Sequence, residues 1–96
     1  MFEERYFPSN RLKDWLTAHA IETEVIGNSE LGQPIHAIRL GEGPVKILMW
    51  SQMHGNESTT TRGLLIWLEK YLQSPSYHKE LSLLIIPQLN PDGADR

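Results

Sequence analysis

The sequence predicts a mixed α/β fold, in which helices flank a mostly buried sheet. Apolar residues recur at intervals of three and four within residues 10–20 and 58–73, which is the spacing of helices. Short apolar or β-branched runs, bounded by turn residues, lie between and after these segments and are typical of strands. The order strand, helix, strand over residues 45–89 indicates a βαβ unit with a right-handed crossover.

The first part of the chain is expected to form a helix followed by a hairpin. Leu12, Trp15, Leu16 and His19 share one face of the helix predicted for residues 10–20, and Ser9 or Asn10 could cap its start. Two β-prone runs, residues 23–26 and 35–40, then flank a stretch rich in turn residues. This arrangement is typical of a β-hairpin.

The second part is expected to contain the βαβ unit. Residues 47–50 are all apolar, which predicts a central strand covered on both faces. The helix over residues 58–73 should end at Ser74 and Pro75, and residues 81–89 read as a further strand. Such strands need cover on two faces, and only two helices are predicted. We therefore expect residues 1–96 to be an incomplete part of a single domain.

Composition excludes several classes of protein. Of the 96 residues, 40% are hydrophobic and 22% are charged, as in ordinary globular proteins. The net charge of −3 gives no basic patch for nucleic acid, and the absence of cysteine excludes disulfides and Cys-ligated zinc. No apolar run is long enough to span a bilayer, and the charged start does not resemble a signal peptide. We expect a cytoplasmic protein without a membrane or nucleic-acid partner.

The most informative motif is His-Gly-Asn-Glu at residues 54–57. It follows a predicted buried strand and precedes a helix, and open α/β sheets place ligand sites at such carboxyl ends. The imidazole of His54 and the carboxylate of Glu57 are both zinc ligands, and Gly55 permits the turn that would bring them together. We expect His54 and Glu57 to bind one Zn²⁺, although an isolated motif of this kind also occurs by chance.

The remaining histidines and the second motif have plainer interpretations. His19, His36 and His78 are not placed to supply a third ligand. The Asn-Pro-Asp-Gly run at residues 90–93 predicts a tight turn on the same sheet edge, and we do not expect Asp92 to be a ligand. Other large side chains are expected to pack in the core: Trp15, Met49, Trp50, Met53 and Trp67.

Three segments together resemble the M14 family of zinc carboxypeptidases in its bacterial form. They are Met-His-Gly-Asn-Glu-Ser-Thr at residues 53–59, Leu-Asn-Pro-Asp-Gly-Ala-Asp-Arg at residues 89–96 and Gly-Asn-Ser-Glu-Leu-Gly-Gln-Pro-Ile at residues 27–35. The last resembles the first hairpin of the family. The resemblance implies part of a zinc-carboxypeptidase-like fold, with residues 1–96 as the N-terminal part of a single metallocarboxypeptidase catalytic domain. It also implies His54 and Glu57 as zinc ligands and a peptide as substrate.

The resemblance also implies parts that lie after residue 96. A histidine there would be the third zinc ligand, and a glutamate would be the general base. An arginine would stabilise the oxyanion, and a pair of residues would bind the terminal carboxylate of the substrate. Arg96 comes too early for the oxyanion role, so no catalytic residue is assigned within the chain. Asn56 stands where the digestive animal enzymes carry arginine, and no acidic residue is found to orient His54.

Three functions remain open from the sequence. The first is a zinc metallocarboxypeptidase that removes C-terminal residues from peptides, although we expect the isolated 96-residue chain to be inactive. The second is a zinc acyl hydrolase of the aspartoacylase or succinylglutamate desuccinylase type, which also uses His-Gly-Asn-Glu; the turn at residues 90–94 favours the peptidase. The third is a non-catalytic fragment.

Overall fold

A four-stranded mixed sheet forms one layer of the molecule. The computed structural model describes residues 7–54 and 58–95. The strands are β1 (Glu24–Asn28), β2 (Pro34–Leu40), β3 (Val45–Trp50) and β4 (Leu81–Ile86), in the spatial order β1-β2-β4-β3. With helices beside this sheet, the mixed α/β class predicted from the sequence is confirmed.

Strand pairing confirms both the hairpin and the βαβ unit. β1 pairs with β2 in the antiparallel sense, and Glu24 lies opposite Ala37. β2 pairs antiparallel with β4, whereas β3 and β4 run parallel in register, from Val45 opposite Leu81 to Trp50 opposite Ile86. The helix that follows β3 makes this parallel connection possible, because a parallel pair needs a long crossover.

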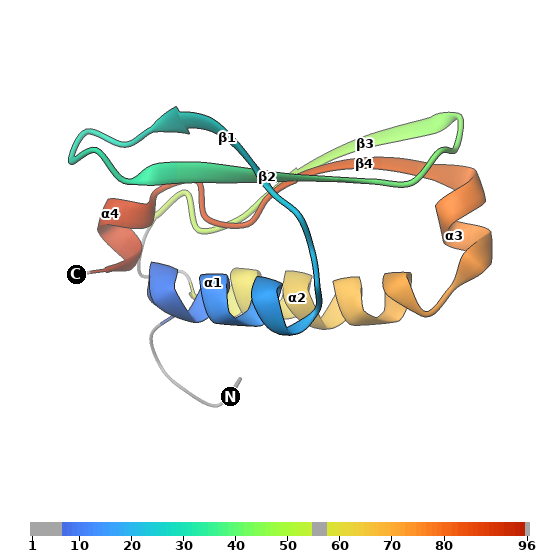
Figure 1. Cartoon of the computed structure of the whole chain (residues 1–96), viewed down its shortest axis with the longest axis horizontal. Coiled ribbons are helices and arrows are strands. Elements are labelled where there is room, and N and C mark those ends of the chain that lie inside the picture. Colours follow the sequence, from blue (N-terminus) through green and yellow to red (C-terminus); the bar gives the residue numbers. More distant parts are fainter. Residues whose placement is uncertain (1–6, 55–57, 96) are drawn as a thin grey trace.

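Two long helices cover one face of the sheet, as Figure 1 shows: α1 (Ser9–Ala18) and α2 (Ser58–Leu72). Two short helices lie at opposite ends of the sheet, α3 (Pro75–Glu80) and α4 (Pro91–Ala94). Neither short helix was predicted from the sequence. Pro75 was expected only to end a helix, but proline also suits the first helical position, and it begins α3 here. The strand expected to reach residue 89 ends at Ile86.

The core lies between this helical layer and the sheet. α1 contributes the face predicted for it, and Trp15 is fully buried. The apolar stripe of α2 packs onto the same cluster, together with the residues of β2 and β4 that point toward the helices. Met49 and Trp67 pack against it from the side, as predicted. The buried cluster consists of Phe7, Leu12, Trp15, Leu16, Ile38, Leu65, Leu68, Tyr71, Leu83 and Ile85.

The opposite face of β3 is open. Leu48 and Trp50 are 56% and 51% exposed, and Met53 beyond the strand is 48% exposed. The prediction that residues 47–50 form a central strand covered on both faces is therefore wrong for the described residues, and so is the core assignment of Trp50 and Met53. β3 lies at the edge of the described sheet, and its residues that pack against the core cluster are Ile47 and Met49.

The start of α1 is capped from the other end of the chain. Pro8 occupies the N-cap position, and no side chain of the helix itself caps it, so the expected capping by Ser9 or Asn10 is wrong. Instead the carboxylate of Asp95 accepts hydrogen bonds from the backbone N–H of Ser9, at 2.7 Å, and from its hydroxyl, at 2.8 Å. A carboxylate at a helix N-terminus is favoured by the helix dipole as well as by these bonds.

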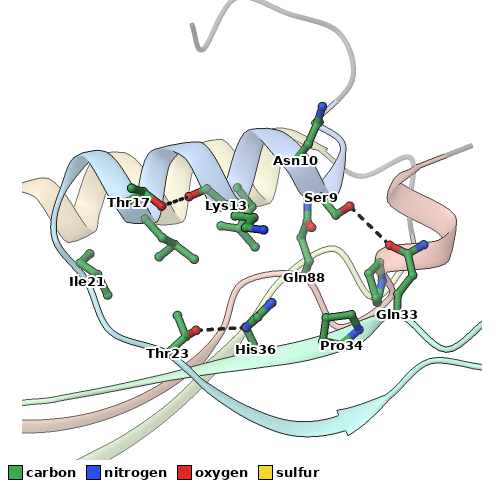
Figure 2. Close-up of a pocket in the computed structure, with 13 residues that line it drawn as sticks. Ser9, Asn10, Lys13, Thr17, Ile21, Thr23, Gln33, Pro34, His36 and Gln88 are labelled. Carbon is green, nitrogen blue, oxygen red and sulfur yellow. Dashed lines mark hydrogen bonds between the residues drawn. The ribbon is translucent and has the colours of Figure 1, made fainter.

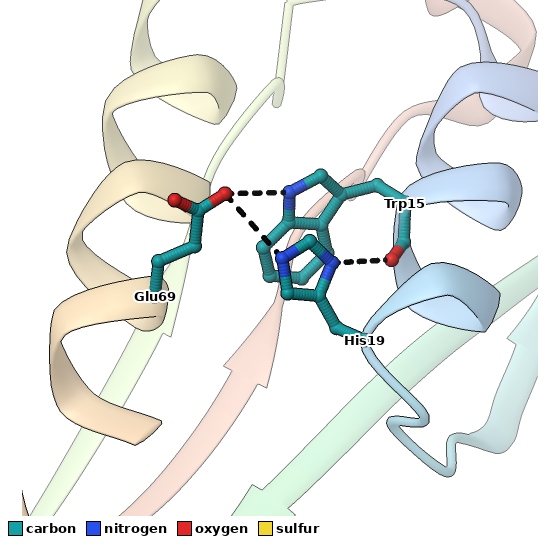
Figure 3. Close-up of polar contacts among 3 residues, drawn as sticks. All are labelled: Trp15, His19 and Glu69. Carbon is teal, nitrogen blue, oxygen red and sulfur yellow. Dashed lines mark hydrogen bonds and ion pairs between the residues drawn. The ribbon is translucent and has the colours of Figure 1, made fainter. Parts of the chain in front are cut away.

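The end of α1 is joined to α2 through Glu69, as Figure 3 shows. The Glu69 carboxylate accepts a hydrogen bond from the Trp15 indole N–H at 3.3 Å and lies 3.4 Å from His19 Nε2. The His19 ring stacks on Trp15, with centroids 4.0 Å apart, and its Nδ1 lies 2.9 Å from the Trp15 carbonyl oxygen. His19 is therefore a packing residue between helices.

One buried hydroxyl lacks a partner among the described residues. The Tyr71 side chain is 3% exposed, and its hydroxyl makes no hydrogen bond there. The hydroxyl lies close to Gly41. A Cβ at that position would come within 2.6 Å of the hydroxyl oxygen, so a glycine is required there. Burial raises the pKa of the Tyr71 phenol, since the charged form is less well solvated.

Replacing Tyr71 by phenylalanine should therefore cost little. We expect the urea midpoint of the complete gene product at pH 8 to stay unchanged or to rise, because Tyr71→Phe removes an unpaired buried polar atom. Since the pKa is raised in the folded state, the wild type should lose stability above about pH 10, where the unfolded chain begins to ionise. The Tyr71→Phe variant should lose less stability over the same pH range. Tyr77→Phe, at an exposed tyrosine, is the control. A loss above ~1 kcal/mol at pH 8 would show that the hydroxyl has a partner.

Candidate metal centre

The carboxyl ends of β3 and β4 meet at one edge of the sheet, because these strands are parallel. The two segments that leave this edge stay together beyond the strands. The Ser51 N–H donates to the Ile86 carbonyl, the Leu89 N–H to the Ser51 carbonyl, and the Asn90 N–H to the Gln52 carbonyl, at 3.0–3.1 Å. The segment that leads to His54 is thus held beside the segment that leads to α4.

His54 lies at this edge, four residues after β3 ends, and its side chain is exposed. The other predicted ligand, Glu57, lies outside the described residues together with Gly55 and Asn56. Convergence of His54 and Glu57 on one metal ion therefore stays a prediction. Residues 7–54 and 58–95 contain no group of three or more histidine, cysteine, aspartate or glutamate side chains that could hold a metal.

The donor chemistry of this edge is nevertheless compatible with zinc. An accessible imidazole at the carboxyl end of a parallel pair has the position and ligand type of a catalytic zinc site, and the sequence adds a carboxylate directly before α2. The other histidines lie elsewhere. His19 packs between α1 and α2, His36 belongs to β2, and His78 lies in α3, before β4 begins.

A buried polar cluster lies beneath the edge. Gln52 is 1% exposed, and its side-chain oxygen accepts hydrogen bonds from the Thr61 hydroxyl at 2.8 Å and from the Gln88 amide at 3.1 Å. The amide nitrogens of Gln52 and Gln88 both donate to the Phe7 carbonyl, at 3.1 and 2.8 Å. The Ser51 hydroxyl donates to the Pro87 carbonyl at 2.6 Å. These contacts were not predicted, since the residues are far apart in sequence and belong to no recognised motif.

The second motif folds as a helix rather than as a simple turn. The side chain of Asn90 accepts the backbone N–H of Gly93 at 3.0 Å and so caps α4, with Pro91 in the first turn. Asp92 then reaches the turn of the first hairpin. Its carboxylate accepts hydrogen bonds from the Ser29 hydroxyl at 2.6 Å, the Gln33 amide at 3.0 Å and the Leu31 N–H at 3.1 Å. Two motifs that the sequence showed separately are thereby joined.

A groove of about 430 Å³ separates α1 from the start of β2, as Figure 2 shows. Its walls include apolar side chains such as Leu12, Leu16 and Pro34. His36 lies on the sheet side, where its Nδ1 is 3.1 Å from the Thr23 hydroxyl. Among the described residues that line the groove, Lys13 and His36 are the charged or titratable ones.

The fold and this edge define a class, the α/β proteins whose ligand sites lie at the carboxyl ends of parallel strands. Within that class, the family model of zinc carboxypeptidases (peptidase family M14) matches residues 14–96. The chain belongs to the zinc carboxypeptidase family. Among the described residues, no helix is both long and apolar enough to cross a membrane.

Two bacterial proteins are similar in sequence. The γ-D-glutamyl-L-diamino acid endopeptidase 1 of Lysinibacillus sphaericus is 32% identical over 100 residues, covering 90% of this chain and 25% of that protein. The uncharacterized protein YqgT of Bacillus subtilis (strain 168) is 34% identical over 84 residues, covering 73% of this chain and 22% of that protein. The chain thus spans about a quarter of the length of these relatives.

Solved carboxypeptidases share the fold. Bovine thrombin-activatable fibrinolysis inhibitor, in complex with tick carboxypeptidase inhibitor, superposes with a TM-score of 0.81 at 19% identity, over 98% of this chain and 34% of that one. A metallo-carboxypeptidase from Burkholderia cenocepacia gives 0.75 at 19% identity, over 93% and 28% of the two chains. At 19% sequence identity, these matches show a shared fold and nothing further.

Asp92→Asn should loosen the hairpin turn. Hydrogen bonds to a charged group contribute about 1.5–3 kcal/mol, and asparagine offers a neutral oxygen in place of the carboxylate. We expect faster amide hydrogen exchange in residues 29–33 and a lower urea midpoint of the complete gene product. Glu30→Gln removes the same charge from an exposed position of that turn and should change neither quantity. Equal effects of the two variants would contradict the role assigned to Asp92.

Proposed function

We propose that the complete gene product is a zinc-dependent metallocarboxypeptidase, in which residues 1–96 form the N-terminal part of one catalytic domain. The observation that carries this proposal is the family match over residues 14–96, which includes the His54 segment. The open apolar face of β3 and the greater length of the relatives support a larger domain. Peptides with a free C-terminus would be the substrates.

His54 and Glu57 would hold the zinc in this proposal, together with a histidine from the rest of the protein. The bound ion would polarise the scissile carbonyl and lower the pKa of a water molecule. The described residues contribute position rather than proton transfer. The parallel pair of β3 and β4 sets the edge, and the backbone bonds from Ser51 and Gln52 keep the His54 segment beside Leu89 and Asn90.

His54→Ala tests the proposal directly. We expect the complete gene product to lose most of its bound zinc, measured by atomic absorption, together with its release of C-terminal amino acids, because only two protein ligands would remain. The matched control is His78→Ala, which removes an exposed histidine of α3, before β4 begins. If His54→Ala keeps full zinc and full activity, the assignment of the site is wrong.

A second candidate function is cleavage of γ-D-glutamyl-L-diamino acid bonds. The 32% identity to an endopeptidase named for that bond favours it. The acyl hydrolase that also uses His-Gly-Asn-Glu is the third candidate, and the Asn-Pro-Asp-Gly-Ala sequence at residues 90–94 counts against it.

A panel of three substrates separates these functions. A metallocarboxypeptidase should release the last residue from a peptide with a free C-terminus. It should release no residue from the same peptide after C-terminal amidation. Faster hydrolysis of a γ-D-glutamyl-L-diamino acid peptide would favour the second candidate. Hydrolysis of an N-acyl amino acid but of neither peptide would favour the acyl hydrolase. The isolated 96-residue chain should hydrolyse none of the three, because the general base is expected outside it.

A further inference from the structure

Gln52 has an unusual backbone for its residue type. Its φ angle is 55°, in the left-handed region that is unfavourable for residues other than glycine. It lies two residues after the end of β3 and two residues before His54, so this conformation sets the direction in which the chain leaves the sheet. Such strain persists only where the surroundings determine the conformation, and it is common at functional sites.

The surroundings of Gln52 do determine it. Its side-chain oxygen accepts the Thr61 hydroxyl and the Gln88 amide, and its nitrogen donates to the Phe7 carbonyl. The opposite orientation of the amide would place nitrogen against the Gln88 nitrogen and oxygen against the Phe7 oxygen, so the orientation is fixed. A buried amide with partners on both ends holds the strained backbone in place.

Thr61 is the partner that links Gln52 to α2. It lies in the first turn of the helix and is fully buried. A hydroxyl has one proton to donate, and the Ser51 hydroxyl gives its own to the Pro87 carbonyl at 2.6 Å. The nearest acceptor for the Thr61 proton is the Gln52 side-chain oxygen, at 2.8 Å, compared with 3.1 Å to the Ser51 hydroxyl and 3.4 Å to the Pro87 carbonyl. Gln52 precedes His54 in the sequence and Thr61 follows it. Their hydrogen bond therefore joins the end of β3 to the beginning of α2.

We infer that Gln52 is a positioning residue for the metal site: with Thr61 it fixes the backbone from which His54 extends, so that the affinity for zinc depends on the Gln52–Thr61 contact. This inference rests on the proposed function. Groups that orient metal ligands without touching the metal typically change affinity by about 10–100-fold when they are removed. A merely structural role would change the stability of the apoprotein and leave zinc affinity as it was.

Three variants test the hydroxyl of Thr61 and the side-chain amide of Gln52. Thr61→Val keeps the shape and removes the hydroxyl, whereas Thr61→Ser keeps the hydroxyl. Gln52→Gly removes the amide but accepts the left-handed φ without strain. The dissociation constant for zinc is measured in the complete gene product by competition with a chromophoric chelator, and urea unfolding of the apoprotein is measured in parallel. Leu68→Ala, in the buried face of α2, is the control for lost stability alone.

We expect Thr61→Val and Gln52→Gly each to weaken zinc binding by about 10–100-fold, and the double variant to be little weaker than either, since both remove one contact. Thr61→Ser should bind zinc like the wild type. Leu68→Ala should lower the urea midpoint while leaving the zinc dissociation constant unchanged. Gln52→Gly relieves the backbone, so it keeps the test usable where Thr61→Val folds poorly.

The inference is overturned if Gln52→Gly and Thr61→Val bind zinc as tightly as the wild type, or if Leu68→Ala weakens binding as much as they do. A wild-type protein that binds zinc would leave the proposed function standing in either case. A wild-type protein that binds no zinc would overturn both the proposed function and the inference, so the two failures can be told apart.

Discussion

The parallel pairing of β3 with β4 is the constraint on which the rest of the arrangement depends. Because both strands point the same way, both of the segments that follow them emerge at one edge of the sheet. Backbone hydrogen bonds from Leu89 and Asn90 continue this pairing past the strand ends. The two motifs, separated by more than thirty residues in the sequence, become neighbours for this reason alone.

Polar side chains then fix what the strands bring together. Asp92 connects α4 to the first hairpin, Asn90 caps α4, and Gln52 connects β3 to α2. Each of these side chains is buried or partly buried and makes at least one bond to a segment or helix end that hydrophobic packing would leave free to shift. Burial of the apolar cluster between the helices and the sheet stabilises the fold but is not directional. The directional hydrogen bonds of these side chains set the geometry of the sheet edge.

The sequence predicted the long elements well and the local chemistry poorly. Periodic apolar residues gave α1, α2, the hairpin and the parallel pair, because these depend on burial over many residues. The length of β4, the helix at residues 91–94 and the exposure of Trp50 depend on single contacts and on which strands are neighbours, and no periodicity encodes these. His54 was singled out through its motif and its place after a strand, and its role as a metal ligand stays a prediction. Gln52 was missed because its partners, Phe7, Thr61 and Gln88, come from three distant segments.

The cap of α1 has a consequence for biosynthesis. The carboxylate that satisfies the first turn of the helix belongs to Asp95, eighty-six residues farther along the chain than Ser9. A ribosome releases the N-terminal segment long before it adds that carboxylate, so until then the Ser9 N–H of the nascent helix can bond only to water. Docking of α1 in its final form must therefore follow translation of the α4 segment. A chain stalled before residue 95 would leave its first helix prone to fraying.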